Sequence, residues 1–263
     1  MKVTLQKGKK KLYFNIPASW NELTLGRYMR LMKTIKESKD DKEIEQVVKI
    51  LNCISDIPKK EIYGLDMKSV GILGNHIKTF LETEPNDELE HFITVEDVQY
   101  GFHPKLVDMT LGEFVDLETY TKDINENLHK ILSILYRPVK QRVNDKYIIE
   151  DYEPNEERAN LFKKHLTVKD FNGASVFFLR FRKTTFDTYE QVFEGSNNEG
   201  ETKFGETIET KWGWYNTIYM LANENILNFD EVTKLPLYQC LTFLAYKQDY
   251  NKKLEDEYRR NKV

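Results

Sequence analysis

Apolar residues recur at steps of three and four along most of the chain, the spacing of a helix with one buried face. The clearest example carries Ile44, Val47, Val48 and Leu51 on one side. The same spacing predicts further helices over residues 24–35, 66–81, 128–135 and 156–193, the last of them broken near Thr167 and Thr184. The pattern therefore predicts a mainly α protein, organised as a multi-helix bundle.

The densest apolar pattern lies near the C-terminus, where it predicts two successive helices. One face of the first helix would carry Trp212, Tyr215, Tyr219, Ala222 and Ile226. The second helix, opened by Pro236, would bury Leu237, Leu241 and Leu244. Because large apolar side chains are stabilised by burial, we expect this pair of helices to form a core on which the rest of the chain packs.

The last predicted helix continues beyond Tyr246 as a highly charged segment. Its remaining large side chains, Tyr250, Leu254 and Tyr258, lie four residues apart and so form one stripe. Such a stripe is too narrow for a core helix and suits a single contact along one edge. We therefore predict these three residues as contacts with a partner.

Three short stretches alternate apolar and polar residues, which is typical of β-strands. The first surrounds Gly8 within residues 3–16, the second covers residues 92–102, and the third covers residues 139–149 around an Asn144-Asp145 turn. These hairpins complete the predicted fold class, an α-rich α+β protein.

Two segments of the chain resemble each other. Residues 23–31, LTLGRYMRL, match residues 109–117, MTLGEFVDL, and each follows strand-like residues and a proline. In the second copy Thr110 and Glu113 have the spacing of a capping box. The similarity indicates either a structural repeat of hairpin, proline and capped helix, or helix-start chemistry that arose twice.

These patterns predict a division of the chain into consecutive segments. Residues 1–104 would form a hairpin with a helical subdomain, and residues 105–194 a second helical subdomain that carries the hairpin 139–149. The glycine- and asparagine-rich residues 195–205 are expected to form a mobile loop. Residues 206–263 would then dock on the body as C-terminal helices.

Composition describes an ordinary globular chain of 263 residues, with 40% hydrophobic and 31% charged residues. The formal net charge of −4 disfavours a dedicated duplex-DNA binder but leaves room for a local basic patch. The two cysteines, Cys53 and Cys240, are expected to be buried, reduced thiols. We expect no signal peptide and no membrane-spanning helix, because no apolar run approaches the roughly 20 residues that a bilayer requires.

The search for catalytic chemistry finds no catalytic, cofactor-binding or metal-binding residues. The five histidines are scattered without metal-ligand spacing, and the sequence contains neither a phosphate-binding glycine loop nor a nucleophile elbow. We therefore expect a protein that is not an enzyme and that needs no cofactor.

Two groups of basic residues remain. Arg137, Lys140, Arg142 and Lys146 on the third hairpin are candidate contacts for nucleic acid or an acidic partner, although the acidic residues that follow favour an ordinary solvated hairpin. Arg180, Arg182 and Lys183 lie in an aromatic-rich helix. There they could meet phosphates, but such residues more often extend to solvent or pair with a buried acid.

Several motifs resemble those of tailed-phage proteins. Trp212-Gly-Trp-Tyr, Val232-Thr-Lys-Leu-Pro and Leu241-Thr-Phe-Leu-Ala-Tyr-Lys look like a pattern in proteins encoded among tail and neck genes. Ile16-Pro-Ala-Ser-Trp with residues 23–31 is similar to the start of phage tail-assembly-chaperone-like proteins. Residues 109–117, with Leu135-Tyr-Arg-Pro and Tyr147-Ile-Ile-Glu, resemble the middle of related proteins from phages of Bacteroides-type hosts, including crAss-like phages.

This resemblance covers about a third of the chain and implies a non-enzymatic phage protein that acts through protein–protein contacts. We expect a virion component (neck, tail or packaged cargo) that is assembled in the host cytoplasm. Its partners would be other phage structural proteins, and a homo-oligomer is compatible with this role. The alternatives are a transient tail-assembly chaperone and, from another class, a nucleic-acid-associated protein that uses the basic hairpin.

Overall fold

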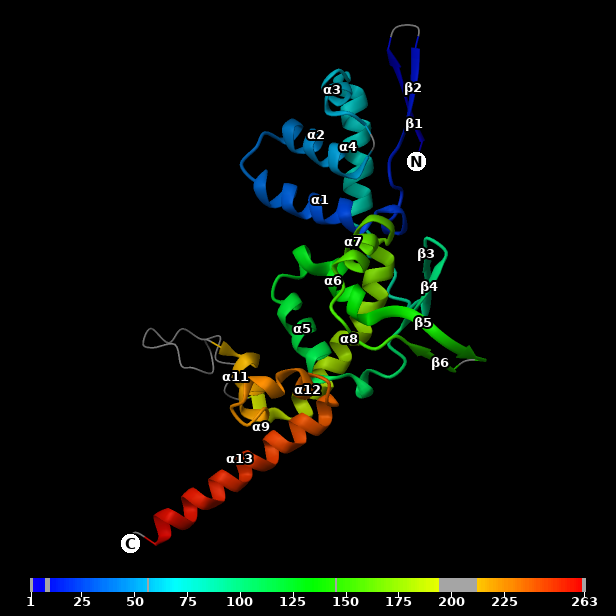
Figure 1. The fold of residues 1–263 in the computed structure, drawn as a ribbon. Coiled ribbons are helices and arrows are strands. Elements are labelled where there is room, and N and C mark those ends of the chain that lie inside the picture. Colours follow the sequence, from blue (N-terminus) through cyan, green and yellow to red (C-terminus); the bar gives the residue numbers. More distant parts are fainter. Residues whose placement is uncertain (1, 8–9, 56, 145, 194–211, 262–263) are drawn as a thin grey trace. The chain divides into compact units, whose positions relative to one another are not determined.

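The fold was analysed in a computed structural model that describes residues 2–7, 10–55, 57–144, 146–193 and 212–261. Within these ranges twelve α-helices accompany two small antiparallel sheets (Figure 1). The predicted fold class, an α-rich α+β protein, is confirmed. None of the described helices combines the length and the apolar character that crossing a membrane requires. The expected mobile loop, 195–205, lies outside the described residues.

Contacts group the chain into two compact units, and each unit combines segments that are distant in sequence. Unit 1 contains residues 1–103 and 120–177, and unit 2 contains residues 104–119 and 178–263. The sequence predicted consecutive segments instead, because periodicity identifies elements but carries no information about which distant elements pack together. Two helices, α5 (Leu111–Thr121) and α8 (Val168–Thr188), contribute residues to both units.

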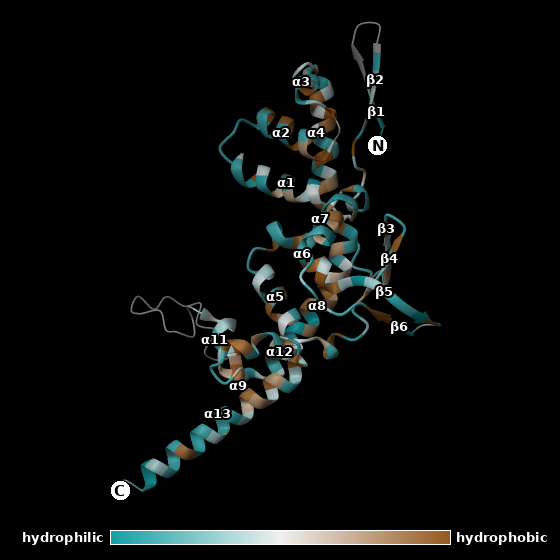
Figure 2. Cartoon of the chain, in the orientation of Figure 1, coloured by the Kyte–Doolittle hydropathy of each residue, from teal (hydrophilic) through white to brown (hydrophobic). Residues whose placement is uncertain are grey.

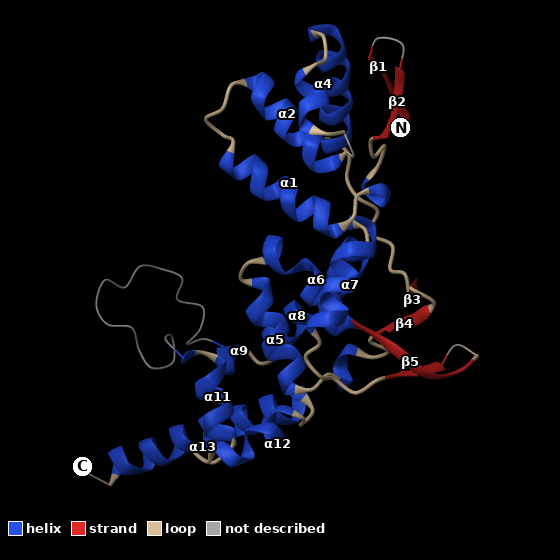
Figure 3. Ribbon diagram, turned by 45° about the horizontal axis from the view of Figure 1, so that its top comes forward, coloured by secondary structure: helices blue, strands red, loops and turns tan. Residues whose placement is uncertain are grey.

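Unit 1 holds most of the remaining elements (Figure 3). Its other helices are α1 (Leu25–Glu37), α2 (Glu43–Ile54), α3 (Lys59–Tyr63), α4 (Met67–Leu81), α6 (Ile124–Leu135) and α7 (Glu156–His165), with the 3-10 turn η1 (Trp20–Glu22). Its strands are β1 (Lys2–Lys7), β2 (Lys10–Asn15), β3 (Phe92–Val95), β4 (Val98–Phe102), β5 (Tyr136–Val143) and β6 (Lys146–Ile149). Strands β1 and β2 form a sheet of their own, whereas the other four pair in the order β3-β4-β5-β6.

Unit 2 is built from shorter helices and one long helix. They are α9 (Glu190–Phe193), α11 (Trp214–Leu221), α12 (Phe229–Thr233) and α13 (Leu237–Arg260), with the 3-10 turns η2 (Leu106–Asp108) and η3 (Ile226–Asn228).

The resemblance between residues 23–31 and 109–117 is matched by the same local structure. Each segment follows a hairpin, a proline and a 3-10 turn, and each begins a helix, α1 or α5. In the first copy Leu25 N–H donates to Leu166 O (2.8 Å) and Val168 N–H donates to Leu23 O (3.0 Å). The start of α1 is thereby paired with the start of α8 by two reciprocal backbone hydrogen bonds.

The second copy repeats this arrangement within unit 2. Leu111 N–H donates to Leu235 O and Leu237 N–H donates to Met109 O, both at 2.9 Å. The start of α5 is thereby paired with the start of α13, as α1 is with α8. The first N–H groups of a helix have no partner inside it, so each pairing satisfies two donors that would otherwise be unpaired. The similarity therefore reflects a structural repeat, with one copy of the crossing in each unit.

The two copies differ in how their threonines act. Thr110 and Glu113 form the predicted capping box, in which Glu113 Oε2 accepts from Thr110 N–H (2.6 Å) and Thr110 Oγ1 accepts from Glu113 N–H (3.2 Å). Thr24 occupies the N-cap position of α1, but its hydroxyl makes no capping hydrogen bond. The side-chain capping chemistry of the second copy is therefore not repeated at Thr24.

A glycine follows the pairing point in each copy, and both glycines lie against backbone. A Cβ added at Gly26 would lie 3.0 Å from Lys163 O, and one added at Gly112 would lie 3.1 Å from Thr233 O. Lys163 lies in the last turn of α7 and Thr233 ends α12, the helices that precede α8 and α13, so their close approach beside each crossing depends on the absence of a side chain at the glycine.

The core of unit 1 follows the predicted helix faces in part. Val48, Leu51, Leu73 and Ile77 belong to one buried cluster with Leu23, whereas Ile44, predicted on the same face as Val48 and Leu51, is exposed. Trp20 closes an edge of this cluster, packing on Phe80 with ring centroids 4.5 Å apart.

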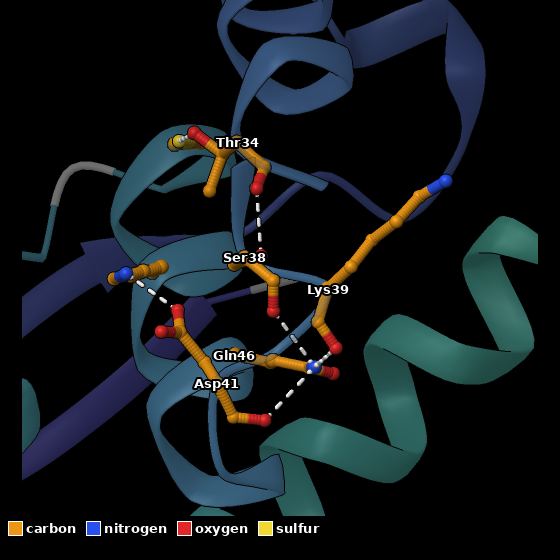
Figure 4. A network of polar contacts seen from close by, with 7 residues as sticks. Thr34, Ser38, Lys39, Asp41 and Gln46 are labelled. Carbon is orange, nitrogen blue, oxygen red and sulfur yellow. Dashed lines mark hydrogen bonds and ion pairs between the residues drawn. The ribbon is translucent and has the colours of Figure 1, made fainter. Parts of the chain in front are cut away.

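The connection between α1 and α2 is held by the side-chain amide of Gln46 (Figure 4). Its Nε2 donates to Ser38 O (2.9 Å), Lys39 O (3.3 Å) and Asp41 O (3.2 Å). Lys49 Nζ reaches Asp41 Oδ2 at 2.5 Å. These contacts fix a charged stretch that contributes little to the apolar core.

Two of the sequence predictions for helices are wrong. Helix α8 runs through Thr184 without the expected break, and the Thr184 hydroxyl donates to Arg180 O one turn earlier (3.1 Å), a bond that accommodates threonine inside a helix. The expected single helix from Trp212 to Ile226 is also interrupted. Asn223 and Glu224 adopt positive φ angles of 53° and 63°, which end the helical path.

This interruption changes which C-terminal residues are buried. Among the five residues predicted for the core face, only Ala222 is buried, and the exposed ones are Trp212, Tyr215, Tyr219 and Ile226. Helix α11 instead directs Trp214 towards Phe114 (5.6 Å between centroids) and Phe193 (5.9 Å). The prediction for the next helix is confirmed, because Leu237, Leu241 and Leu244 are buried.

Gly26→Ala is expected to lower the free energy of unfolding by about 1–2 kcal/mol, because the new methyl group would press on a fixed carbonyl. Gly71 in α4 is the matched control, since nothing lies within 4 Å of an added Cβ there. Gly71→Ala should stabilise by roughly 0.5–1 kcal/mol through helix propensity. Urea unfolding followed by circular dichroism measures both, and equal stabilisation by the two changes would contradict the close crossing.

Candidate partner-binding surfaces

Helix α13 has a buried first part and an exposed second part. Leu237, Cys240, Leu241 and Leu244 pack into unit 2, with Leu237 and Leu241 fully buried. From Tyr246 to the last described residue every side chain is exposed. Figure 2 shows the corresponding change along α13, from hydrophobic residues near its start to mainly hydrophilic ones. The second part therefore leaves the core of its own unit.

Apolar side chains nevertheless continue along the exposed part, and we name them the exposed stripe. Its members are Phe243, Tyr246, Tyr250, Leu254 and Tyr258. The exposed fractions of Tyr250, Leu254 and Tyr258 are 48%, 45% and 62%, so the three predicted contact residues are accessible. That they contact a partner stays a prediction.

The exposed stripe is not an extension of the buried face. At 100° per residue, its centre lies roughly 110° around the helix from the centre of the face formed by Leu237, Cys240, Leu241 and Leu244. Phe243 and Tyr246 begin the stripe, and they were missed in the sequence because they were grouped with the apolar run before them. Their spacing from Tyr250, seven and four residues, was the available signal. The offset means that α13 presents two apolar faces, of which its own unit buries one.

Local contacts along the helix support the exposed part. The rings of Tyr246 and Tyr250 stack with centroids 6.1 Å apart. Lys253 pairs with Glu257 at 3.8 Å, and Glu255 pairs with Arg259 at 4.0 Å, each across one helical turn. Such exposed pairs contribute only about 0.2–0.5 kcal/mol each. These two ion pairs stabilise the helix slightly, and neither of them covers the exposed stripe.

The basic hairpin does not form a continuous cationic surface. Arg137 is buried, with 4% of its area exposed, and it lies over the Tyr152 ring at 5.9 Å. Its prediction as a surface contact is therefore wrong. The reason is that Arg137 pairs with Gly101 in the middle of the sheet and not at the projecting end of the hairpin.

The other three basic residues of the hairpin are exposed. Lys140 pairs with Asp151 at 3.1 Å, and Arg142 stacks over the Phe92 ring at 4.0 Å. Lys146 lies beside the turn. Two of the three thus already contact groups of their own unit, an arrangement that favours the solvated hairpin over a nucleic-acid arm.

Arg182 pairs with a buried acid, one of the two alternatives expected for this basic group. Its Nε and Nη2 donate to Glu118 Oε1 (2.5 Å) and Oε2 (2.9 Å), and its guanidinium lies 4.3 Å from the Phe186 ring centroid. Glu118 is 7% exposed. This bidentate pair links α5 to α8 inside unit 2, and no spacing in the sequence could identify Glu118 as its acid, because the two residues are 64 positions apart.

Replacing Glu118 by glutamine is expected to destabilise the protein by about 1–3 kcal/mol, because it weakens a bidentate, partly buried ion pair. Asp108 provides the control, since its contact with Lys105 is exposed and 4.0 Å long. Asp108→Asn should change stability by less than about 0.5 kcal/mol. Thermal or urea unfolding of the two variants makes the comparison, and equal effects would show that the Glu118 pair contributes no more than a surface contact.

The described residues hold no group of three or more His, Cys, Asp or Glu side chains arranged for a metal ion. Cys240 is buried as expected, and burial raises the pKa of its thiol to about 11, which makes the nucleophilic thiolate scarce at neutral pH. Cys53 is only half-buried, with its sulfur 3.1 Å from Thr34 Oγ1, so complete burial was wrong for this residue.

His129 in α6 is buried, and its Nδ1 has no hydrogen-bond partner in the described part of the chain. Burial, with the nearby charges of Lys163 and Lys130, lowers the pKa of His129 to about 4. The neutral ring is therefore the form compatible with the folded unit.

The stability of the protein should consequently fall as the pH decreases from about 6.5 towards 4. The unfolded chain binds a proton at His129 in this interval and the folded chain does not, so up to about 3 kcal/mol is lost. Replacing His129 by glutamine should flatten the pH dependence over the same interval. Urea unfolding at several pH values tests this, and an unchanged slope in the variant would assign the effect to other groups.

Comparison with known proteins gives no relatives: no family model, no curated protein and no solved structure matches the chain significantly.

Proposed function

We propose that this protein is not an enzyme and acts through protein–protein contacts, as a virion component of a tailed phage in its neck, tail or packaged cargo. The observation that carries the contact role is the exposed stripe on α13. A soluble helix normally buries its apolar side chains, yet this one keeps a second apolar row in solvent. A partner structural protein that packs against this row would remove it from water. The resemblance of the sequence motifs to tail- and neck-region proteins supports the phage context.

The chemistry of the exposed stripe defines the kind of partner. Four of its five residues are aromatic, and tyrosine is enriched at protein interfaces because it combines a large apolar area with a polar hydroxyl. Charges of both signs flank the row, so the contact would have an apolar centre and a polar rim. An apolar groove that receives one face of a helix is the surface that fits it.

Changing Tyr250, Leu254 and Tyr258 together to alanine should remove the protein from purified particles while leaving its fold intact. The three side chains are exposed, and alanine favours the helix. Loss of such a row from an interface is expected to weaken binding by at least about 2 kcal/mol, roughly 30-fold. Quantitative mass spectrometry of particles assembled with each variant measures incorporation, and circular dichroism verifies the fold.

The same helix offers a matched control. Gln248, Lys252 and Asp256 have the same spacing and lie roughly 160° around the helix from Tyr250, Leu254 and Tyr258. Their replacement by alanine should leave incorporation unchanged. If the wild-type protein is absent from stringently purified particles but present in assembly intermediates, the transient-chaperone alternative replaces the virion role. Equal incorporation of the wild type, the exposed-stripe variant and the control variant would rule out the exposed stripe as the contact.

A further inference from the structure

Strand β3 forms an open edge of the four-stranded sheet. It pairs with β4 on one side, in a register that places Ile93 opposite Tyr100 and Thr94 opposite Gln99. In the strand order β3-β4-β5-β6, no other strand of the described residues pairs with its second side. An edge of this kind presents unpaired backbone groups that can accept an added strand.

The register identifies the groups at this edge. Phe102 N–H donates to His91 O at 2.9 Å, so alternate residues from His91 onwards point their backbone groups towards β4. Phe92 and Thr94 therefore direct their N–H and C=O groups away from the sheet. Within the described ranges no hydrogen bond reaches these four groups.

A hollow of about 400 Å³ lies along the same edge. Its walls are β3 on one side and the junction of α7 and α8 on the other, represented by His165, Leu166 and Asp170. Glu90 and Glu96 line it at the two ends of the strand. Lys169 and Lys164 contact these glutamates, at 2.6 Å and 3.9 Å, but neither lysine lines the hollow. His165 does line it, with Nε2 3.3 Å from Glu96 Oε1. The space is therefore bounded by β3, by three carboxylates, by one histidine and by apolar side chains.

The sequence around β3 is strongly acidic. Residues 79–104 contain no lysine or arginine, and their acidic residues are Glu82, Glu84, Asp87, Glu88, Glu90, Glu96 and Asp97. The N-terminal hairpin has the opposite composition, since no acidic residue precedes Glu22 and its lysines are Lys2, Lys7, Lys9, Lys10 and Lys11. Opposite charge at the edge and on the hairpin would steer the two together.

Within the part of the chain that the structure describes, strands β1 and β2 pair only with each other. An isolated two-stranded hairpin is marginally stable in water. We propose that the N-terminal hairpin of a second copy of this chain adds to the β3 edge, where it extends the four-stranded sheet and brings its lysines to the acidic rim. This surface is separate from α13 and does not depend on the proposed virion role. The contact joins two different surfaces, so it would generate a reciprocal dimer, a ring or a filament.

The full-length protein tests this by sedimentation velocity over a range of concentrations. The wild type should associate, and the association should weaken as salt rises, because exposed charges contribute to it. Thr94→Pro should reduce association at least 10-fold, since proline removes an N–H that β4 does not use. Glu96→Lys is a second variant at the β3 edge, and it keeps every backbone N–H group. Glu157→Lys makes the same change of charge at an exposed position of α7 and serves as its control.

Mixing an edge variant with a hairpin variant tests whether the N-terminal hairpin is the segment that binds the β3 edge. Lys2 and Lys11 are exposed on the hairpin, and changing both to glutamate should abolish self-association as Thr94→Pro does. A mixture of these two variants should form a 1:1 heterodimer and nothing larger, because it retains one intact edge and one intact hairpin. Circular dichroism confirms that each variant is folded. A wild type that stays monomeric, a hairpin variant that associates normally, or a mixture that fails to pair would each overturn the proposal.

Discussion

The reciprocal pairing of two helix starts is the interaction on which both units depend. Leu25 N–H donates to Leu166 O and Val168 N–H donates to Leu23 O across the starts of α1 and α8, and Leu111 and Leu237 make the equivalent bonds across the starts of α5 and α13. Each crossing satisfies N–H groups that a helix cannot satisfy internally and fixes helices far apart in sequence. A glycine beside each crossing allows the close approach of the helix that precedes α8 or α13. The remaining apolar contacts of each unit are organised around a crossing of this kind.

The crossing in unit 2 also explains how α13 presents its surface. It holds the helix at its first residue, and Leu241 and Leu244 bury one face within the next two turns. The helix then continues to Arg260, far beyond the last residue that its own unit covers. A firmly anchored start and an exposed apolar stripe are suited to binding a partner, because little additional ordering of the helix is required. This is the physical basis for the proposed role in protein–protein contacts.

Charge separates the surfaces that are available for binding from those that serve the fold. Arg182 and Arg137 were candidate contacts for phosphates or an acidic partner in the sequence, but both are used inside their units, one with Glu118 and the other over the Tyr152 ring. The charges that remain in blocks are the lysines of the N-terminal hairpin and the acidic segment around β3. A sheet edge with unpaired backbone groups lies within the acidic block, and this combination favours self-association over nucleic-acid binding.

The sequence by itself determined the fold class, most helices and hairpins, the Thr110–Glu113 capping box and the accessibility of Tyr250, Leu254 and Tyr258. These features follow from local periodicity and from spacing of a few residues, which short-range physics controls. Only the tertiary structure decided that Trp214 packs inward while Trp212 is exposed, that Arg137 is buried, and that α1 pairs with α8. Each of these depends on a contact between distant segments or on a backbone turn such as Asn223–Glu224. Spacing along one segment cannot show which of two apolar faces another segment will cover.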